Sequence, residues 1–265
     1  MKLLGGRYVL LEKCSSGSFS TVYKGLDKLT NEEVAIKCES KTSNLKLLKN
    51  EAKIYNYIGY KKGICALKYF GATSSMYYMV TTLLGKPISS ISISTRGDFH
   101  RLMNMLLYLV RSFHDMGFVH RDISLNNFHL GLDGDIYLID FGISMFYRDD
   151  FQVHMSPYML SGMMGSLHYV SINVHDRVGP SRRDDIESWV YIVMYLYYNK
   201  YLKTPNNSLW FEDSDEMLIR NKKHNFKSMS LVDDVFEQLL RYVRSIKYEE
   251  SPDYILCESF ITRLP

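Results

Sequence analysis

The sequence predicts an α+β fold in which a small antiparallel sheet is followed by a mainly helical region. Two observations support this prediction. Residues 1–83 contain short apolar runs between turn residues, which is typical of strands, and longer apolar segments with a helical period follow residue 98. The chain has 265 residues, 46% of them hydrophobic, which is enough for a large core in one long domain or in two lobes.

Five strands and one helix are expected before residue 84. The strands are predicted, in chain order, at Tyr8–Lys13, Phe19–Gly25, Glu33–Cys38, Leu67–Phe70 and Tyr77–Thr82. Leu45–Ile58 is predicted as a helix because its apolar residues recur every three or four positions. Together these elements predict a five-stranded antiparallel sheet with one helix.

The rest of the chain is predicted to be mainly helical. Residues 84–87 contain Gly85 and Pro87 and are expected to form a hinge. One short strand is expected at Asp135–Ile139. Helices are predicted at Phe99–Met116, which Gly117 is placed to end, and at Asp185–Tyr198, Leu231–Ile246 and Asp253–Ile261.

Charge and cysteine content exclude several classes of protein. Lys and Arg number 32 against 29 Asp and Glu, and this net charge of +3 predicts neither nucleic-acid binding nor membrane binding. The 4 cysteines are scattered without a C-x-x-C pair, so reduced thiols in a cytoplasmic or nuclear protein are expected rather than zinc ligands or disulfides. No signal peptide is expected, and no apolar run is long enough to span a membrane.

The strongest functional signal is His120-Arg121-Asp122, followed by Asn127 and then by Asp140-Phe141-Gly142. Phosphoryl transfer from Mg-ATP needs a carboxylate that positions the acceptor hydroxyl, and an amide and a carboxylate that hold the metal. Asp122 is therefore predicted as the base or positioning group, and Asn127 and Asp140 as Mg²⁺ ligands. Unrelated Asx turns at strand ends would not explain all three residues at this spacing.

A lysine and a glutamate upstream fit the same chemistry. Lys37 ends the string Val34-Ala35-Ile36-Lys37 on a predicted strand, and Glu51 follows fourteen residues later on the predicted helix. Each residue alone is more often a surface charge. With the downstream motifs present, an ion pair is predicted that aims the ammonium at the ATP phosphates.

The loop from Ser15 to Val22 resembles the glycine-rich lid that covers the phosphates in such enzymes. Glycine suits this lid because it lets backbone N–H groups approach phosphate oxygens. Only Gly17 is present here, and Ser15 and Ser20 replace the outer glycines. Without the other motifs, the loop would be interpreted as a plain β-hairpin turn.

Two segments in the second half point to a particular family. Residues 165–173 read Gly-Ser-Leu-His-Tyr-Val-Ser-Ile-Asn, and residues 181–188 read Ser-Arg-Arg-Asp-Asp-Ile-Glu-Ser. The chain resembles the casein kinase I family in these segments, in Leu83-Leu84-Gly85 and in Asn126-Asn127-Phe128, over about residues 8–261. The resemblance implies a bilobal protein kinase domain over 1–265, with a first lobe at 1–83, a hinge at 84–87 and a second lobe at 88–265.

The resemblance also implies an activity and a nucleotide site. The activity is phosphorylation of serine and threonine in protein substrates, often acidic or already phosphorylated ones. Leu84 would meet adenine through its backbone, Thr81 would be a small gatekeeper that opens the pocket behind adenine, and Asp185 would brace the catalytic loop. The full set expected around ATP is Ser15, Gly17, Val22, Ala35, Lys37, Glu51, Thr81, Leu84 and His129.

Several residues depart from the family pattern. Ser124 replaces the catalytic-loop lysine, which removes positive charge from the place where negative charge develops. His129 replaces a leucine under adenine, and His168, only partly charged at neutral pH, replaces an arginine that helps to bind a primed phosphate. A basic run, which could attract acidic substrates or simply form a solvated face, comprises Arg220, Lys222, Lys223, His224 and Lys227.

Three functional hypotheses remain from the sequence. The first is an active serine/threonine kinase that is slowed by the loss of lysine at position 124. The second is a pseudokinase that acts as a binding protein, because the departures gather around the nucleotide. The third is a kinase that mainly phosphorylates itself, for example at Ser15 or Ser16. In each case the chain is expected to lack a long regulatory tail.

Overall fold

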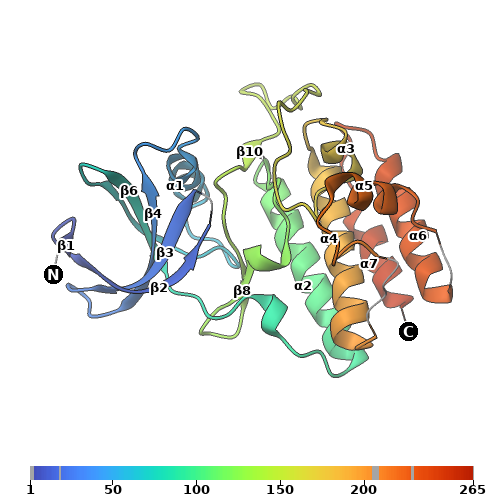
Figure 1. Cartoon of the computed structure of the whole chain (residues 1–265), viewed down its shortest axis with the longest axis horizontal. Helices are drawn as coiled ribbons and strands as arrows, with labels where there is room; N and C mark the ends of the chain where they lie inside the picture. Colours follow the sequence, from blue (N-terminus) through green and yellow to red (C-terminus); the bar gives the residue numbers. More distant parts are fainter. Residues whose placement is uncertain (1–2, 18, 205–208, 228–229, 265) are drawn as a thin grey trace. The chain divides into compact units, whose positions relative to one another are not determined.

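The computed structural model describes residues 3–17, 19–204, 209–227 and 230–264, and it confirms the predicted α+β class (Figure 1). The chain divides into two compact units. The first comprises Met1–Ile88 with Phe128–Ser144, and the second comprises Ser89–Asn127 with Met145–Pro265. Residues 128–144 fall in the predicted second lobe but cluster with the first unit, and the lobe boundaries stay a prediction.

The first unit contains one antiparallel sheet with the strand order β1-β2-β3-β4-β6-β5 (Figure 1). All five predicted strands are present. The predicted count of five is wrong because Leu3 and Leu4 add a sixth strand, which is too short to show an alternating pattern. The strands are β1 (Leu3–Leu4), β2 (Tyr8–Ser16), β3 (Ser20–Asp27), β4 (Glu33–Ser40), β5 (Leu67–Ala72) and β6 (Met76–Thr82).

The two faces of β4 have different roles because successive side chains of a strand point to opposite sides. Val34 and Ile36 face a hydrophobic core that also contains Tyr78 and Val80 of β6. Ala35 and Lys37 alternate with these core residues and are only half buried. The strand therefore places Lys37 on the face away from this core.

Helix α1 (Leu47–Ile58) begins two residues later than predicted and is capped from a neighbouring strand. Its N-cap residue, Lys46, has a left-handed conformation and supplies no side-chain cap. The buried carboxylate of Glu39 accepts hydrogen bonds from the N–H groups of Leu47 (3.1 Å) and Leu48 (2.7 Å) instead. An anionic acceptor at a helix N-terminus satisfies donors that would otherwise lack partners, so Glu39 fixes where α1 starts.

A small hairpin completes the first unit. It is formed by β8 (Phe128–Leu130) and β9 (Ile136–Leu138), the second of which confirms the strand predicted at residues 135–139. The 84–87 segment pairs with this hairpin: Gly85 N–H donates to the Leu130 carbonyl at 2.7 Å, and Leu130 N–H donates to the Lys86 carbonyl at 3.0 Å.

The second unit is mainly helical, and the four predicted helices are confirmed (Figure 1). Helix α4 packs against α2 and α6, and almost every one of its residues is buried, including the charged side chains Arg182, Asp184, Asp185 and Glu187 of its first two turns. A two-stranded sheet pairs β7 (Phe118–Val119) with β10 (Met145–Phe146). The predicted helices appear as α2 (Arg96–Asp115), α4 (Arg182–Leu196), α6 (Leu231–Ser245) and α7 (Tyr254–Thr262).

Sequence patterns missed several short elements of the second unit. Helix α3 (Ile172–His175) has four residues, too few for a helical period. Helix α5 (Glu216–His224) is rich in charged residues and buries only Ile219 and Lys223. Further unpredicted elements include strands β7 and β10, 3₁₀ turns at Ile88–Ser90 and Leu125–Asn127, and a π-helical turn at Tyr197–Tyr201. Across the described ranges, no helix combines the length and apolarity needed to cross a bilayer.

Candidate active site

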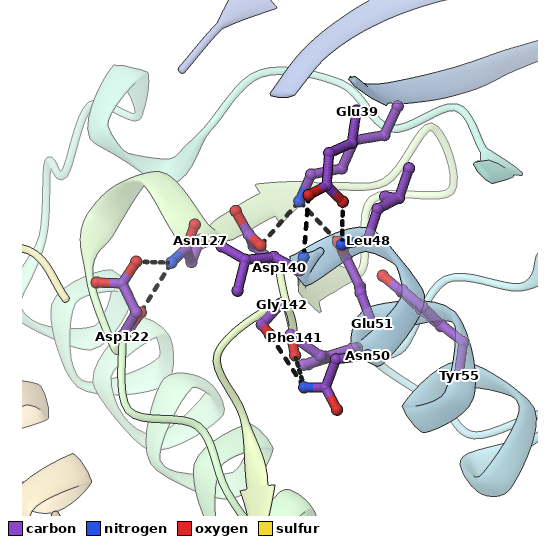
Figure 2. Close-up of polar contacts among 12 residues, drawn as sticks. Glu39, Leu48, Asn50, Glu51, Tyr55, Asp122, Asn127, Asp140, Phe141 and Gly142 are labelled. Carbon is purple, nitrogen blue, oxygen red and sulfur yellow. Dashed lines mark hydrogen bonds and ion pairs between the residues drawn. The ribbon is translucent and has the colours of Figure 1, made fainter. Parts of the chain in front are cut away.

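In the first unit, the predicted ion pair between Lys37 and Glu51 is present, and Asp140 joins it (Figure 2). Lys37 Nζ lies 2.7 Å from Glu51 Oε2 and 2.8 Å from Asp140 Oδ1. The side chains of Lys37 and Glu51 are 17% and 3% exposed, whereas that of Asp140 is 44% exposed. Strand β4 thus supplies a buried lysine, α1 a buried carboxyl group, and the segment after β9 an accessible carboxylate.

The electrostatics of this cluster keep the lysine charged. Burial opposes the charged form of Lys37, but the carboxylates of Glu51 and Asp140 outweigh burial and raise its pKa above the usual value. Burial also raises the pKa of Glu51 to about 7, with Lys37 acting in the opposite direction. At neutral pH the site therefore holds an ammonium ion, which is suited to binding phosphate oxygens.

A cavity of about 160 Å³ lies within the first unit beside this cluster. Lys37, Glu51 and Asp140 line it together with the β2–β3 hairpin, which contributes Gly17 and Ser20. Pockets that take a whole drug-sized ligand are roughly 300–1,000 Å³. The volume here suits a phosphate group rather than a complete nucleotide.

The loop predicted to cover the phosphates is a hairpin, as expected from its turn residues. Gly17 N–H donates to the Ser20 carbonyl at 2.9 Å, and Ser15 pairs with Val22 across the two strands. A Cβ atom at Gly17 would meet only the Ser20 oxygen, at 3.9 Å, so this turn does not require glycine sterically. Ser18 of this loop lies outside the described residues.

The residues predicted around adenine lie in register with Lys37 on the sheet. Val22 is directly opposite Lys37, and Ala35 is directly opposite Thr81. Since Ala35 and Lys37 are two residues apart on β4, these four side chains share one face of the sheet. Their contacts with adenine stay a prediction.

The 84–87 segment and β8 bring two further predicted residues together. His129 Nδ1 donates to the carbonyl oxygen of Gly85 at 3.0 Å, and Leu84 immediately precedes that glycine. The imidazole is therefore tied to the predicted hinge, an interaction that a leucine at position 129 could not make. The side chain of Thr81 is hydrogen-bonded to the Cys65 thiol, which is also hydrogen-bonded to the hydroxyl of Tyr55.

In the second unit, Asp122 and Asn127 form a fixed pair (Figure 2). Asn127 Nδ2 donates to Asp122 Oδ2 at 3.0 Å and to the Asp122 carbonyl at 2.8 Å. The other carboxylate oxygen, Oδ1, accepts the N–H of Ser166 at 2.8 Å. Both oxygens of Asp122 are thus oriented by neighbouring groups, as a group that positions a substrate hydroxyl requires.

Asp185 braces the start of this loop, as the family resemblance implies. Its Oδ2 accepts the N–H of His120 at 2.6 Å, and its Oδ1 accepts the N–H of Arg121 at 2.8 Å. Burial alone would raise the pKa of Asp185, but interactions with His114 and the loop lower it, so the carboxylate is anionic. Arg121 has a left-handed backbone (φ 73°), which these hydrogen bonds help to maintain.

The side chains predicted to hold Mg²⁺ have suitable chemistry. Asp140 offers a half-exposed carboxylate, and Asn127 uses its amide N–H groups on Asp122, which leaves its carbonyl oxygen as the ligand atom. Within the described ranges, no group of three or more His, Cys, Asp or Glu could hold a metal alone. Mg²⁺ is commonly held by one or two protein oxygens together with substrate phosphates.

Ser124, which stands where a lysine is expected, is buried in the second unit at 2% exposure. Its carbonyl oxygen accepts the N–H of Asn127 at 3.1 Å. This hydrogen bond forms a tight turn in the backbone between Ser124 and Asn127, but the side chain at position 124 carries no positive charge.

Four residues of the predicted basic run are exposed or partly exposed, but Lys223 is fully buried, so both predicted interpretations are wrong for this residue. Lys223 Nζ donates to the backbone carbonyls of Leu167 (3.1 Å) and Val170 (2.8 Å). Arg220 and Lys222 are ion-paired with Asp176 and Asp213 at 2.6 and 2.7 Å. Most of the run therefore stabilises the second unit.

Sequence reasoning did not identify Lys223 as a residue that supports the site through backbone contacts. Lys223 anchors the segment whose Ser166 N–H orients Asp122. One signal could have identified it: Lys223 lies four residues after the buried Ile219, on the same helix face. His168, which replaces an arginine that helps to bind a primed phosphate in the similar family, donates through Nε2 to the Asp213 carbonyl at 2.7 Å.

A buried lysine paired with a helix glutamate, an accessible aspartate beside it and a hydrogen-bonded Asp-Asn loop define the catalytic domain of a protein kinase. Comparison with known families agrees. A family model described as "Protein kinase domain" matches residues 8–250, and the chain belongs to this family.

Proposed function

We propose that this chain is an active protein serine/threonine kinase related to the casein kinase I family. The observation that supports activity most directly is the arrangement of Asp122, whose two carboxylate oxygens are held by Ser166 and Asn127 at 2.8 and 3.0 Å. A carboxylate oriented in this way is what a group that positions a substrate hydroxyl requires.

The proposed reaction transfers the γ-phosphoryl group of ATP to a substrate hydroxyl. Lys37, held between Glu51 and Asp140, would bind phosphate oxygens, and Asp140 of the first unit and Asn127 of the second would each offer an oxygen ligand to Mg²⁺. Asp122 orients the hydroxyl and accepts its proton as the new phosphorus–oxygen bond forms and the bond to ADP breaks.

Serine/threonine specificity is supported by the SRRDD segment at 181–185 and by residues 165–173. Preference for acidic substrates has less support. Of the basic run, His224 and Lys227 are exposed, whereas Lys223 is buried and Arg220 and Lys222 are ion-paired. We therefore propose that acidic substrates, if preferred, are selected by these two exposed residues.

A pseudokinase is the second candidate, and one observation favours it. Position 124 carries a buried serine in place of a cation, so one source of transition-state stabilisation is missing. Nucleotide affinity does not separate the two candidates, because a pseudokinase can retain ATP. Turnover does separate them.

The test is transfer of label from γ-labelled Mg-ATP to casein, followed by identification of the phosphorylated amino acids. Phosphoserine or phosphothreonine in casein supports the proposal, and phosphotyrosine contradicts the specificity. Label confined to the chain itself would support the third hypothesis, autophosphorylation. Mass spectrometry of the protein after the reaction would then locate the acceptor residues. Absence of any label at saturating Mg-ATP contradicts an active kinase.

A further inference from the structure

We propose that Asn50 is a positioning residue, whose side chain clamps the Asp140-Phe141-Gly142 segment and thereby keeps Asp140 beside Lys37. The effect on Mg-nucleotide binding rests on the proposed function. The clamp itself is a property of the first unit, to which all of these residues belong.

The contacts of Asn50 are directed at one short stretch of backbone (Figure 2). Its Nδ2 donates to the carbonyl oxygens of Gly142 (3.0 Å) and Ser144 (2.9 Å), with a longer contact to that of Phe141 (3.4 Å). All three partners are acceptors, so only the NH₂ side of the amide can face them. The side chain thus closes the backbone immediately after Asp140 onto helix α1.

The neighbouring residues of α1 hold the same segment. The Glu51 carboxylate receives a backbone hydrogen bond from Phe141, and the Tyr55 ring packs on the Phe141 ring at 4.9 Å between centroids. Leu47 approaches Gly142 so closely that a Cβ atom on the glycine would lie 3.2 Å from the Leu47 Cβ. Positions spaced by three and four residues line one side of a helix, so this side of α1 is a continuous support for the segment.

Among the described contacts between this side of α1 and the segment, only Asn50 contributes side-chain N–H donors. Glu51 is already committed to Lys37, and Leu47 and Tyr55 contribute packing. Removing the donors would abolish the two short hydrogen bonds from Asn50 to the carbonyls of Gly142 and Ser144. The segment would then open more often, and Asp140 would leave Lys37 with it.

Two variants remove the donors without changing the size of the side chain. Asn50→Leu replaces the amide by an apolar group, and Asn50→Asp replaces it by oxygens that repel the three carbonyls. The control is Asn56→Leu, which changes an exposed asparagine on the same helix. Thermal melting establishes that each variant is folded.

The first readout is amide hydrogen exchange of residues 141–146 in the protein without nucleotide. Both Asn50 variants should exchange about tenfold faster or more in this segment, the scale expected for losing hydrogen bonds of this kind, and Asn56→Leu should match the parent. The second readout is the dissociation constant for ADP. For both Asn50 variants this constant should rise about tenfold with Mg²⁺ present and remain unchanged with EDTA, because only the metal-bound form of ADP uses Asp140.

Unchanged exchange of residues 141–146 in a folded Asn50→Leu or Asn50→Asp protein would overturn the clamp. Equal weakening of ADP binding with and without Mg²⁺ would overturn its link to Asp140. Because Asn50→Leu can also lose stability, Asn50→Asp decides the matter if the leucine variant does not fold. If the Asn50 variants exchange faster than the parent but the parent transfers no phosphate, the proposed function is contradicted and the clamp is still supported.

Discussion

Ser166 and Asp122 are joined by a 2.8 Å hydrogen bond from the serine N–H to Oδ1 of the aspartate, although 44 residues separate them in the chain. This contact depends on Gly165, which has a left-handed backbone (φ 93°). A Cβ atom there would lie 2.7 Å from the carbonyl oxygen of Arg121. The orientation of the proposed catalytic carboxylate is therefore encoded partly by a glycine in a distant segment.

Replacing this glycine should impair catalysis. Gly165→Ala would displace Ser166 N–H from Asp122 and should lower kcat about 10- to 100-fold, because misplacement of a positioned group by about 1 Å has effects of that size. KM for ATP should change little. Gly162→Ala is the matched control, since a Cβ atom at Gly162 meets nothing within 4 Å. Equal steady-state constants for the two variants would contradict the role of the Ser166–Asp122 contact.

Restoring a cation at position 124 should accelerate phosphoryl transfer. Ser124→Lys should raise kcat about tenfold or more, because a positive charge would then face the developing negative charge. Ser124→Met adds similar length without charge and should give no such increase. If the methionine variant is accelerated as much as the lysine variant, the gain comes from side-chain bulk and not from charge.

Lys223 should matter for stability far more than its neighbours in the basic run. Lys223→Met removes the partner of two buried carbonyls and should cost about 2–4 kcal/mol in the free energy of unfolding. Arg220→Ala breaks an accessible ion pair with Asp176 and should cost at most about 1 kcal/mol. Urea denaturation measures both, and similar small losses would show that Lys223 does not anchor the segment at Leu167 and Val170.

His175 should make the stability of the second unit sensitive to acid. Burial is the main reason that the pKa of His175 falls from 6.5 to about 3, and the neighbouring cationic side chains act in the same direction. Below pH 6.5 the unfolded chain therefore takes up a proton that the folded chain does not, and stability falls as the pH drops toward 3.

The matched variant for this pH dependence is His175→Gln. Lys223 Nζ lies 3.2 Å from His175 Nε2, and a glutamine oxygen can accept the same hydrogen bond without titrating. Melting temperatures between pH 7 and pH 4 should fall less steeply for His175→Gln than for the parent. Parallel curves would show that His175 does not contribute to the acid sensitivity.

Much of the fold and of the charged cluster follows from local patterns in the sequence. Val34, Ile36 and Lys37 alternate as a half-buried strand should, and Lys37 and Glu51 were paired because a strand lysine and a helix glutamate occur at the spacing of a known motif. Asp122, Asn127 and Asp140 were identified in the same way. Local patterns therefore predict the strand and the ion pair, whereas the chemical roles of Asp122, Asn127 and Asp140 stay predictions.

The contacts that the sequence did not predict are long-range contacts of polar residues. Asn50 is an ordinary helix asparagine until the backbone at 141–144 is placed beside it, and Glu39 becomes the cap of α1 only when the strand and helix meet. The basic run predicts either a surface for acidic substrates or a solvated face, and neither interpretation places Lys223 in the interior. Its three acceptors come from Leu167, Val170 and His175, which no local pattern connects to it.

The most direct test of the central claim compares the parent with Asp122→Asn in transfer of γ-phosphate from saturating Mg-ATP to casein. Asparagine preserves the size of the side chain but cannot accept the proton of the substrate hydroxyl. The account predicts steady labelling by the parent and a decrease of about 10²- to 10⁴-fold in the variant, with ADP binding unchanged. Equal labelling by both proteins, or none by either, would contradict the assignment of Asp122 as the group that activates the substrate.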